Sequence, residues 1–202
     1  MSSRQILLSG LFLCLFAVVG TSFVAVTEHN TRASIAQNER RVLLRNLHAL
    51  LPAEKLDNDI VTDTLSVSAS ELLGTETDSL VYRARLRGES VAAIFNSIAP
   101  NGYSGKIHLL VGVYTDGKIA GVRAVKHAET PGLGDALDIQ KSDWVLDFDG
   151  KSLDNPSRTS WLVKRDGGGF DQFTGATISP RAVVQAVKNT LLYYEQNATR
   201  LF

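Results

Sequence analysis

The feature that most constrains this chain is an uncharged run of 21 residues, Ile6 to Val26, bounded by Arg4 and Glu28. A run of this length, rich in Leu, Phe and Val, can cross a hydrocarbon core about 30 Å thick as a helix. The alternative is a secretory signal peptide, whose apolar core usually spans only about 7 to 15 residues before a small-x-small cleavage site. Phe23-Val24-Ala25 is a poor cleavage context. The sequence therefore predicts an uncleaved transmembrane helix over residues 6–26, after a short N-terminus of residues 1–5.

Helical spacing continues from Thr31 to Leu51, and Pro52 is expected to end it. The apolar positions of this segment fall near one stripe: Ile35, Val42, Leu43 and Leu47. Residues 27–52 can therefore be a stalk helix above the membrane or the first helix of the following domain. Both interpretations remain open. Residues 53–202 are predicted to form one domain.

The charges that flank the apolar run bear on its orientation. Arg4 and the terminal amine precede it, whereas four arginines follow it at positions Arg32, Arg40, Arg41 and Arg45. Because positive charge is enriched on the cytoplasmic side of membrane helices, this count favours a cytoplasmic C-terminal domain.

Composition excludes several functions. Lys plus Arg and Asp plus Glu number 21 each, so no basic excess indicates nucleic-acid binding. Cys14 is the single cysteine, which excludes an intramolecular disulfide and a Cys-ligated zinc or iron–sulfur site. The four histidines lack paired spacing, so no metal site is predicted. If this protein transfers electrons, it needs an organic cofactor.

The central third of the chain carries the strand signals. The predicted strands are Val81 to Leu86, Ser90 to Ala99, Lys106 to Tyr114 and Lys118 to Val125. The last two form a hairpin, because Asp116-Gly117 readily adopts tight-turn dihedrals. Short connections favour antiparallel pairing, and the sheet is expected to begin near Leu80. The predicted fold is α+β, with a mixed, mostly antiparallel sheet and packed helices behind one transmembrane helix.

A helix is predicted from the apolar spacing between Ala182 and Tyr194. Ser179 is its expected N-cap, and Pro180 suits the first helical position. Thr177 lies two residues before this cap, beside Gly175-Ala176, which gives its hydroxyl little cover. Since a helix N-terminus offers unpaired N–H groups and positive dipole, a phosphate on Thr177 would be stabilised there.

Two further segments could contact a ligand. Glu129-Thr130-Pro131-Gly132-Leu133-Gly134 predicts a tight loop with exposed backbone edges, to which Leu133 could add apolar cover for a flat ring. A purely structural turn is the alternative. Lys164, on a predicted alternating strand from Trp161, and Arg165 could place a cation near such a ring, or could be solvated charges.

Trp144 and Trp161 could stack on a ring, although two tryptophans in a domain of this size more often belong to the core. The sequence contains no nucleophile elbow, Cys–His couple or glycine-rich phosphate motif, so no catalytic side chain is predicted.

Three motifs carry a resemblance to known families. Asp171-x-x-Thr174-Gly175-Ala176-Thr177 resembles the acceptor motif of proteins that carry FMN as a phosphoester on the last threonine. Segments 101–112 and 127–137 are similar to signature segments of the G subunit of the Rnf (Rsx) ion-translocating electron transport complex. The C subunit of the sodium-pumping NADH:quinone reductase shares the E-T-P-G-L-G and S/T-G-A-T elements. The resemblance extends from the N-terminal anchor to about Thr190.

The resemblance implies a membrane-anchored flavoprotein that relays electrons between ferredoxin and NADH in an ion-translocating complex, without independent turnover. FMN would be joined to Thr177 by a flavin transferase, which would read Asp171. The other residues implied at the flavin are Glu129, Thr130, Gly132, Leu133, Gly134, Lys164, Thr174, Gly175 and Ala176. The implied partners are the transferase and the other membrane and iron–sulfur or flavin subunits.

The resemblance also implies a location. Residues 1–5 would be cytoplasmic, the helix would span the bacterial inner membrane once, and the domain would lie on the periplasmic side. This conflicts with the arginine count. The alternative function is a cofactor-free anchored assembly or ligand-binding subunit, in which T-G-A-T is only the start of a helix.

Overall fold

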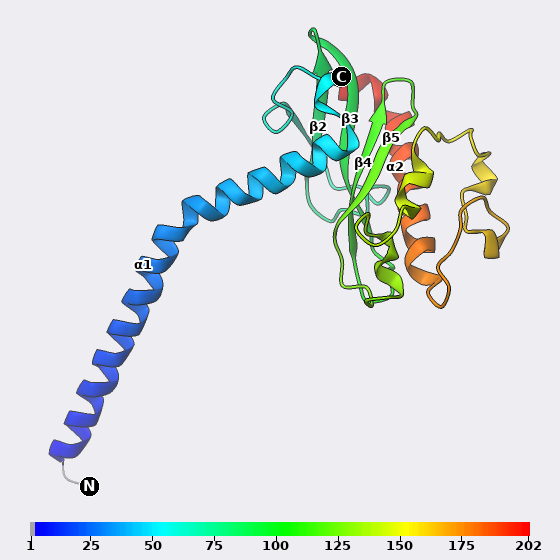
Figure 1. Ribbon diagram of the computed structural model, residues 1–202. Coiled ribbons are helices and arrows are strands. Elements are labelled where there is room, and N and C mark those ends of the chain that lie inside the picture. Colours follow the sequence, from blue (N-terminus) through cyan, green and yellow to red (C-terminus); the bar gives the residue numbers. More distant parts are fainter. Residues whose placement is uncertain (1–2) are drawn as a thin grey trace. The chain divides into compact units, whose positions relative to one another are not determined.

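The computed structural model describes residues 3–202, so the first two residues of the predicted N-terminal segment 1–5 lie outside the described part. Two compact units make up the chain, the first ending at Val42 and the second spanning Leu43–Phe202. The helix α1, Ser3–Leu50, begins in the first unit and ends in the second (Figure 1).

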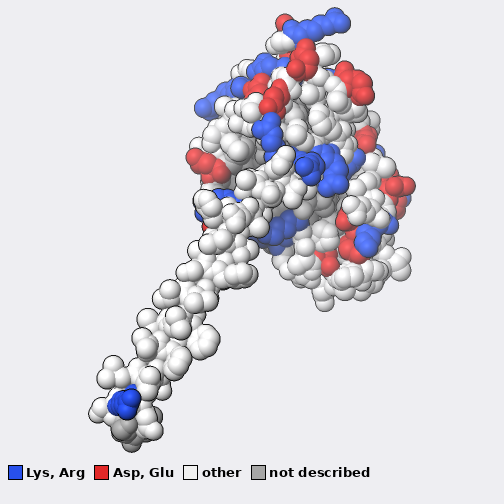
Figure 2. Space-filling view, turned by 60° about the vertical axis from the view of Figure 1, so that its left-hand side comes forward, with Lys and Arg blue, Asp and Glu red and all other residues white. Residues whose placement is uncertain are grey.

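The N-terminal part of α1 has the length and composition of a membrane-spanning helix. None of its most apolar stretch is buried within the protein. Figure 2 shows this surface without charge beyond the basic group near the N-terminus, whereas both signs of charge are interspersed over the second unit. A helix that exposes apolar side chains all round fits a lipid environment.

The second unit contains a five-stranded sheet in which neighbours along the chain are neighbours in space. The strands are β1 (Thr64–Val67), β2 (Ser79–Leu86), β3 (Glu89–Ala99), β4 (Ile107–Tyr114) and β5 (Ile119–Lys126), and each pairs with the next in antiparallel register. The α+β class and the predicted β4–β5 hairpin are confirmed. Asp116 closes this hairpin with its carboxylate, which accepts the N–H of Lys118 at 3.0 Å.

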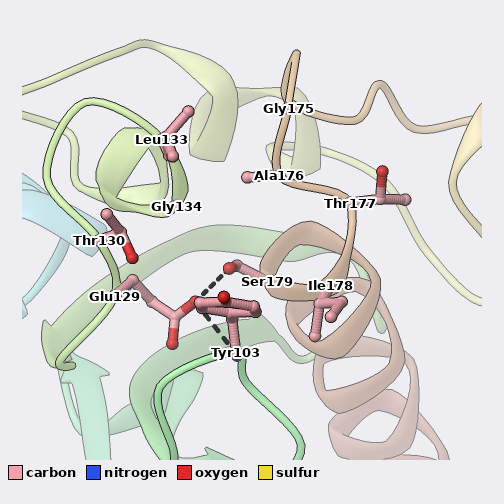
Figure 3. A pocket seen from close by; sticks show the side chains of 10 residues that line it. All are labelled: Tyr103, Glu129, Thr130, Leu133, Gly134, Gly175, Ala176, Thr177, Ile178 and Ser179. Atoms are coloured by element: carbon pink, nitrogen blue, oxygen red, sulfur yellow. Dashed lines mark hydrogen bonds between the residues drawn. The ribbon is translucent and has the colours of Figure 1, made fainter.

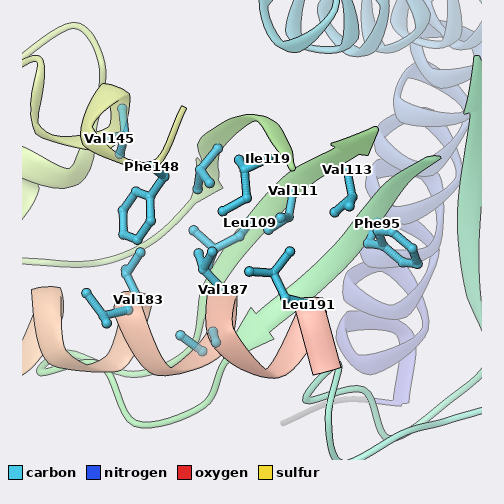
Figure 4. Packing of buried hydrophobic residues seen from close by; sticks show 14 of the residues in the cluster. Phe95, Leu109, Val111, Val113, Ile119, Val145, Phe148, Val183, Val187 and Leu191 are labelled. Carbon is cyan, nitrogen blue, oxygen red and sulfur yellow. The ribbon is translucent and has the colours of Figure 1, made fainter. Parts of the chain in front are cut away.

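One face of the sheet packs against α2, Ile178–Leu201. Alternate residues of β3 and β4 point to this face, including Phe95, Leu109, Val111 and Val113, and they meet Val183, Val187 and Leu191 of the helix (Figure 4). The predicted apolar stripe of the helix is thereby confirmed, since Val183, Val184, Val187, Leu191 and Tyr194 are all buried.

The opposite face is covered by the end of α1. The side chains of Leu47, Leu50 and Leu51 are buried against Ala92, Ile94 and Leu110. Arg123 of β5 donates to the carbonyl of Ala49 at 2.9 Å, which satisfies one of the open acceptors at the helix end. With both faces covered, the strands carry apolar residues at successive positions. From Leu43 onward, α1 is therefore a domain helix.

Three secondary-structure predictions are wrong. The sheet begins at Thr64 and not near Leu80, because the four-residue edge strand β1 lies within a polar stretch. Residues 161–164 form no strand: Trp161 is fully buried and donates its ring N–H to the Ser152 carbonyl, and Lys164 starts the short 3-10 helix Lys164–Asp166. The third concerns the start of α2.

The helix α2 begins at Ile178, with Thr177 as the N-cap residue and without a side-chain cap. Ser179 is therefore in the first turn and Pro180 is the third helical residue. A proline there costs no hydrogen bond, because N–H groups of the first turn have no intrahelical acceptor. The hydroxyl of Ser179 donates elsewhere, to the Glu129 carboxylate.

Candidate functional site

A pocket of about 260 Å³ lies between three segments that are distant in sequence. One wall is the loop after β5, another is the turn that leads into α2, and the third is Tyr103 in the loop before β4 (Figure 3). The lining residues are Tyr103, Glu129, Thr130, Leu133, Gly134, Gly175, Ala176, Thr177, Ile178 and Ser179. Tyr103 and Ser179 are 76 residues apart in sequence. The antiparallel sheet and the helix packed on it bring them to the same pocket.

The turn before α2 presents the threonine hydroxyl. Gly175 has a φ of +81°, which a residue with a side chain adopts only with strain, and an added Cβ would lie 3.3 Å from Leu133. The Ala176 N–H closes the turn by donating to the Phe173 carbonyl at 3.2 Å. Because Thr177 makes no side-chain cap, its hydroxyl is available at the rim of the pocket.

Arg165 is the cation at this hydroxyl. Its Nη1 donates to Thr177 Oγ1 at 3.2 Å. The neighbouring cations have carboxylate partners: Lys164 Nζ lies 2.6 Å from Asp171, and Arg181 forms two hydrogen bonds to Asp166. The hydrogen bonds from Arg181 lower the pKa of the Asp166 carboxyl, and the nearby Arg165 charge contributes in the same direction. Arg165 is thus the basic side chain directed at Thr177.

A buried carboxylate joins the three walls of the pocket. Glu129 is only 4% exposed and accepts hydrogen bonds from the backbone N–H groups of Tyr103 (3.2 Å) and Ser104 (2.9 Å). It also accepts the hydroxyl proton of Ser179. Burying an isolated carboxylate is costly, whereas a carboxylate with several donors is stabilised. Glu129 therefore connects the Tyr103 loop and the first turn of α2 to its own loop.

The predicted tight loop after β5 is present. The Thr130 carbonyl accepts the N–H groups of Leu133 and Gly134, and Asp135 accepts the N–H of Gly132 at 2.7 Å. Gly134 packs so closely that an added Cβ would lie 2.8 Å from Ser179 Oγ. The loop leaves the Leu133 side chain 45% exposed at the pocket. The hydrogen-bonded backbone of this loop therefore holds the apolar side chain of Leu133 at the pocket.

The structure brings most of the residues predicted at the flavin to this pocket. Seven of them line it: Glu129, Thr130, Leu133, Gly134, Gly175, Ala176 and Thr177. Gly132, Lys164, Asp171 and Thr174 do not, so any role of theirs at the flavin stays a prediction. Lys164, on its 3-10 helix, is paired with Asp171.

Sequence reasoning missed three residues of the pocket lining: Tyr103, Ile178 and Ser179. For Arg165 it left both interpretations open, a cation near the ring and a solvated charge. The signal for Tyr103 was an aromatic residue in N-G-Y-S-G, where the flanking glycines favour a loop. Nothing in the sequence distinguishes Arg165 from Lys164 as the cation directed at Thr177, since this depends on how the loop folds.

The two tryptophans lie in the core and not at the pocket. Trp144 donates its ring N–H to the Asp171 carbonyl at 2.9 Å and packs edge-on against Phe173, with ring centroids 5.0 Å apart. Trp161 is fully buried. Neither tryptophan lines the pocket, so the core interpretation applies to both.

Comparisons with known proteins identify the family. A model described as "FMN-binding domain" matches residues 102–192, and one described as "RnfG N-terminal region" matches residues 1–50. Three similar relatives are each named as the G subunit of an ion-translocating oxidoreductase complex. The protein from Pseudomonas aeruginosa strain UCBPP-PA14 is 48% identical over 98% of this chain and 92% of its own length. Those from Pseudoalteromonas atlantica and Shewanella baltica are 46% and 45% identical, each over 96% of this chain and over 90% and 92% of their own lengths. The chain therefore belongs to the family of G subunits of ion-translocating oxidoreductase complexes, and its folded unit contains an FMN-binding domain.

Proposed function

We propose that this protein is a membrane-anchored flavoprotein that relays electrons within an ion-translocating oxidoreductase complex and carries FMN as a phosphoester on Thr177. The observation that carries the proposal is the position of the Thr177 hydroxyl. It lies at the rim of an apolar pocket within the FMN-binding domain and beside the Arg165 guanidinium.

The residues at the pocket fit the two chemically different parts of FMN. Leu133, Ile178 and Tyr103 are large apolar side chains that remain exposed at 45%, 44% and 68%, and they offer apolar cover for a planar ring system. Arg165 and the first-turn N–H groups of α2 suit a phosphate at Thr177. The pocket volume lies below the roughly 300–1,000 Å³ of pockets that enclose a whole ligand, so it would hold part of the cofactor.

Attachment requires a transfer of FMN from FAD, which we assign to a flavin transferase. The Thr177 oxygen forms a new bond to the FMN phosphorus, and the P–O bond to the AMP half of FAD breaks. AMP leaves with the bonding electron pair, and the hydroxyl proton is released. The exchange is redox-neutral. Asp171 and Thr174, which lie outside the pocket lining, are proposed as part of the sequence that the transferase reads.

When bound, FMN supplies the redox chemistry, and the side chains of this chain bind and orient it. Covalent attachment suits a relay on the exterior side of a membrane, because a non-covalently held cofactor would be lost by dilution. The implied partners are the other membrane, iron–sulfur and flavin subunits of the complex. We propose that α1 spans the bacterial inner membrane and that the domain lies on the periplasmic side.

The proposal is tested on denaturing gels. Full-length chain co-expressed with the transferase should give a fluorescent band under ultraviolet light. Thr177→Ala should give a dark band with the fold intact, because a partly exposed hydroxyl outside the core contributes within about 0.5 kcal/mol to stability. Thr177→Ser, which keeps the oxygen, should retain fluorescence. A bright Thr177→Ala band would place the ester elsewhere, and a dark wild-type band would contradict covalent attachment.

A further inference from the structure

Tyr103 is an exposed aromatic residue at the pocket, and packing within the protein does not explain its position. Its side chain is 68% exposed, and it is the one aromatic residue among those that line the pocket. A large side chain of this kind gains free energy when it is buried against an apolar partner. In Figure 3 its ring lies between Glu129 and Ile178.

The backbone that carries Tyr103 is held in place. The Glu129 carboxylate accepts the N–H groups of Tyr103 and Ser104, at 3.2 and 2.9 Å. Before them, a Cβ added to Gly102 would lie 2.3 Å from the Gly105 carbonyl oxygen, so this turn closes only around a glycine. An exposed aromatic ring on a fixed backbone loses little conformational entropy when a ligand covers it.

The same carboxylate also fixes the opposite side of the pocket. Glu129 accepts the hydroxyl of Ser179, two residues after Thr177. Tyr103 and the attachment threonine are therefore held in register through one buried side chain. Glu129 therefore sets the spacing between the aromatic ring of Tyr103 and the phosphate site at Thr177.

We propose that Tyr103 is a cofactor-contacting residue that packs its ring against the isoalloxazine of FMN, and that Glu129 is the positioning residue that orients it. This inference rests on the proposed function, because it takes the pocket beside Thr177 as the flavin site. The electron-rich phenol in contact with the oxidised ring quenches flavin emission. The two side chains thereby give this site a spectroscopic signature that a distant tyrosine would not produce.

The test compares flavin emission before and after denaturation. Full-length protein is flavinylated by co-expression with the transferase, and emission at equal flavin absorbance is measured in detergent and then in denaturant. The wild type should show a large increase on denaturation. Tyr103→Leu should be severalfold brighter than wild type in the native state and equal to it when denatured. Tyr103→Phe, which keeps the ring but lowers its donor strength, should fall between them.

Tyr114→Leu is the matched control, because Tyr114 is at the far end of β4 and does not line the pocket. It should leave the ratio of native to denatured emission at the wild-type value. Glu129→Gln should be brighter than wild type although Tyr103 is still present. Loss of a direct contact between Glu129 and the flavin would not by itself cause this increase in emission. If Tyr103→Leu blocks flavinylation, Tyr103→Trp decides, since a stronger donor in contact should be dimmer than Tyr103→Phe.

An emission ratio in Tyr103→Leu equal to that of wild type, or equal emission from the Phe and Trp variants, would overturn the inference. Failure of the covalent proposal is a separate result. It would leave the denaturing gel dark, whereas failure of the Tyr103 inference alone leaves the gel bright and the emission ratio unchanged.

Discussion

At the scale of single residues, the chemistry of the site depends on which polar groups already have hydrogen-bond or ion-pair partners. The Glu129 carboxylate has three donors, whereas Arg165 forms its side-chain hydrogen bond with the neutral Thr177 hydroxyl. In the proposed phosphoester, a guanidinium in this position would gain an anionic partner at Thr177 without breaking an existing ion pair. The neighbouring Lys164 and Arg181 would each have to leave a carboxylate.

Leu133 tests the apolar wall. Leu133→Asp would place a carboxylate against the pocket, where burying an unpaired charge costs several kcal/mol or forces its protonation. We expect a changed flavin absorption spectrum and slower electron transfer, with the ester still formed because Thr177 is unaltered. Leu146→Asp, at a similarly exposed leucine outside the pocket lining, is the control. A wild-type spectrum and rate in Leu133→Asp would reduce the loop to a structural turn.

At the scale of elements, the sequence predicted those helices and strands whose formation depends on residues close together in the chain. The β4–β5 hairpin follows from Asp116-Gly117 and from alternation on either side, and α2 follows from its apolar stripe. The start of α2 was misplaced because a serine is a strong cap candidate by sequence, yet the Ser179 hydroxyl is taken by Glu129, 50 residues away. Residues 161–164 alternate like a strand but lack a neighbouring strand to pair with along their length. Such outcomes depend on tertiary contacts that spacing does not encode.

The edge strand β1 is held to β2 by a charged cluster that the sequence did not reveal. Asp63, directly before β1, accepts from Arg83 Nε at 2.7 Å and from Arg85 Nε at 2.9 Å. Partial burial raises the pKa of the Asp63 carboxyl, but the hydrogen bonds from Arg85 and Arg83, with their charges, outweigh it and hold the pKa below its usual range. The cluster therefore stabilises the folded state while Asp63 is ionised.

This gives a pH prediction with a definite sign. A carboxyl whose folded pKa is depressed contributes stability above its unfolded pKa of about 3.9, and that contribution is lost as the pH falls through the folded value. Asp63→Asn should lower the free energy of unfolding at pH 7 by about 1 kcal/mol, because partly exposed pairs contribute modestly. The difference from wild type should shrink below about pH 4.

Urea unfolding of the full chain in detergent, followed at several pH values, measures this difference. Glu76→Gln is the control, since its pair with Lys106 is at the surface, with 81% of the glutamate side chain exposed. It should change stability little at any pH. A pH-independent difference between Asp63→Asn and wild type would show that the ionised cluster is not what holds β1.

At the scale of the whole molecule, charge and maturation make opposite demands on the side of the membrane that the folded unit occupies. Arg32, Arg40, Arg41 and Arg45 favour the cytoplasm by the positive-inside count. The proposed flavinylation, by a transferase outside the cytoplasm, would require export. We predict that residues from Glu28 onward are exported, because the charge bias is statistical and other subunits can shield the helix.

Reporter fusions after Phe202 measure the topology. A reporter that is active only after export should work, and one that is active only in the cytoplasm should be silent. The opposite pattern would contradict the proposed topology. It would also require a cytoplasmic route for attaching the flavin.

The most direct test of the central claim is the mass of one peptide. Trypsin should cut after Arg165 and after Arg181, which releases a peptide of residues 166–181 that contains both Thr174 and Thr177. In protein co-expressed with the transferase, we predict that this peptide gains the mass of FMN minus one water, with fragment ions that place the added mass on Thr177. An unmodified peptide from flavin-containing protein, or fragment ions that place the mass on Thr174, would contradict the account.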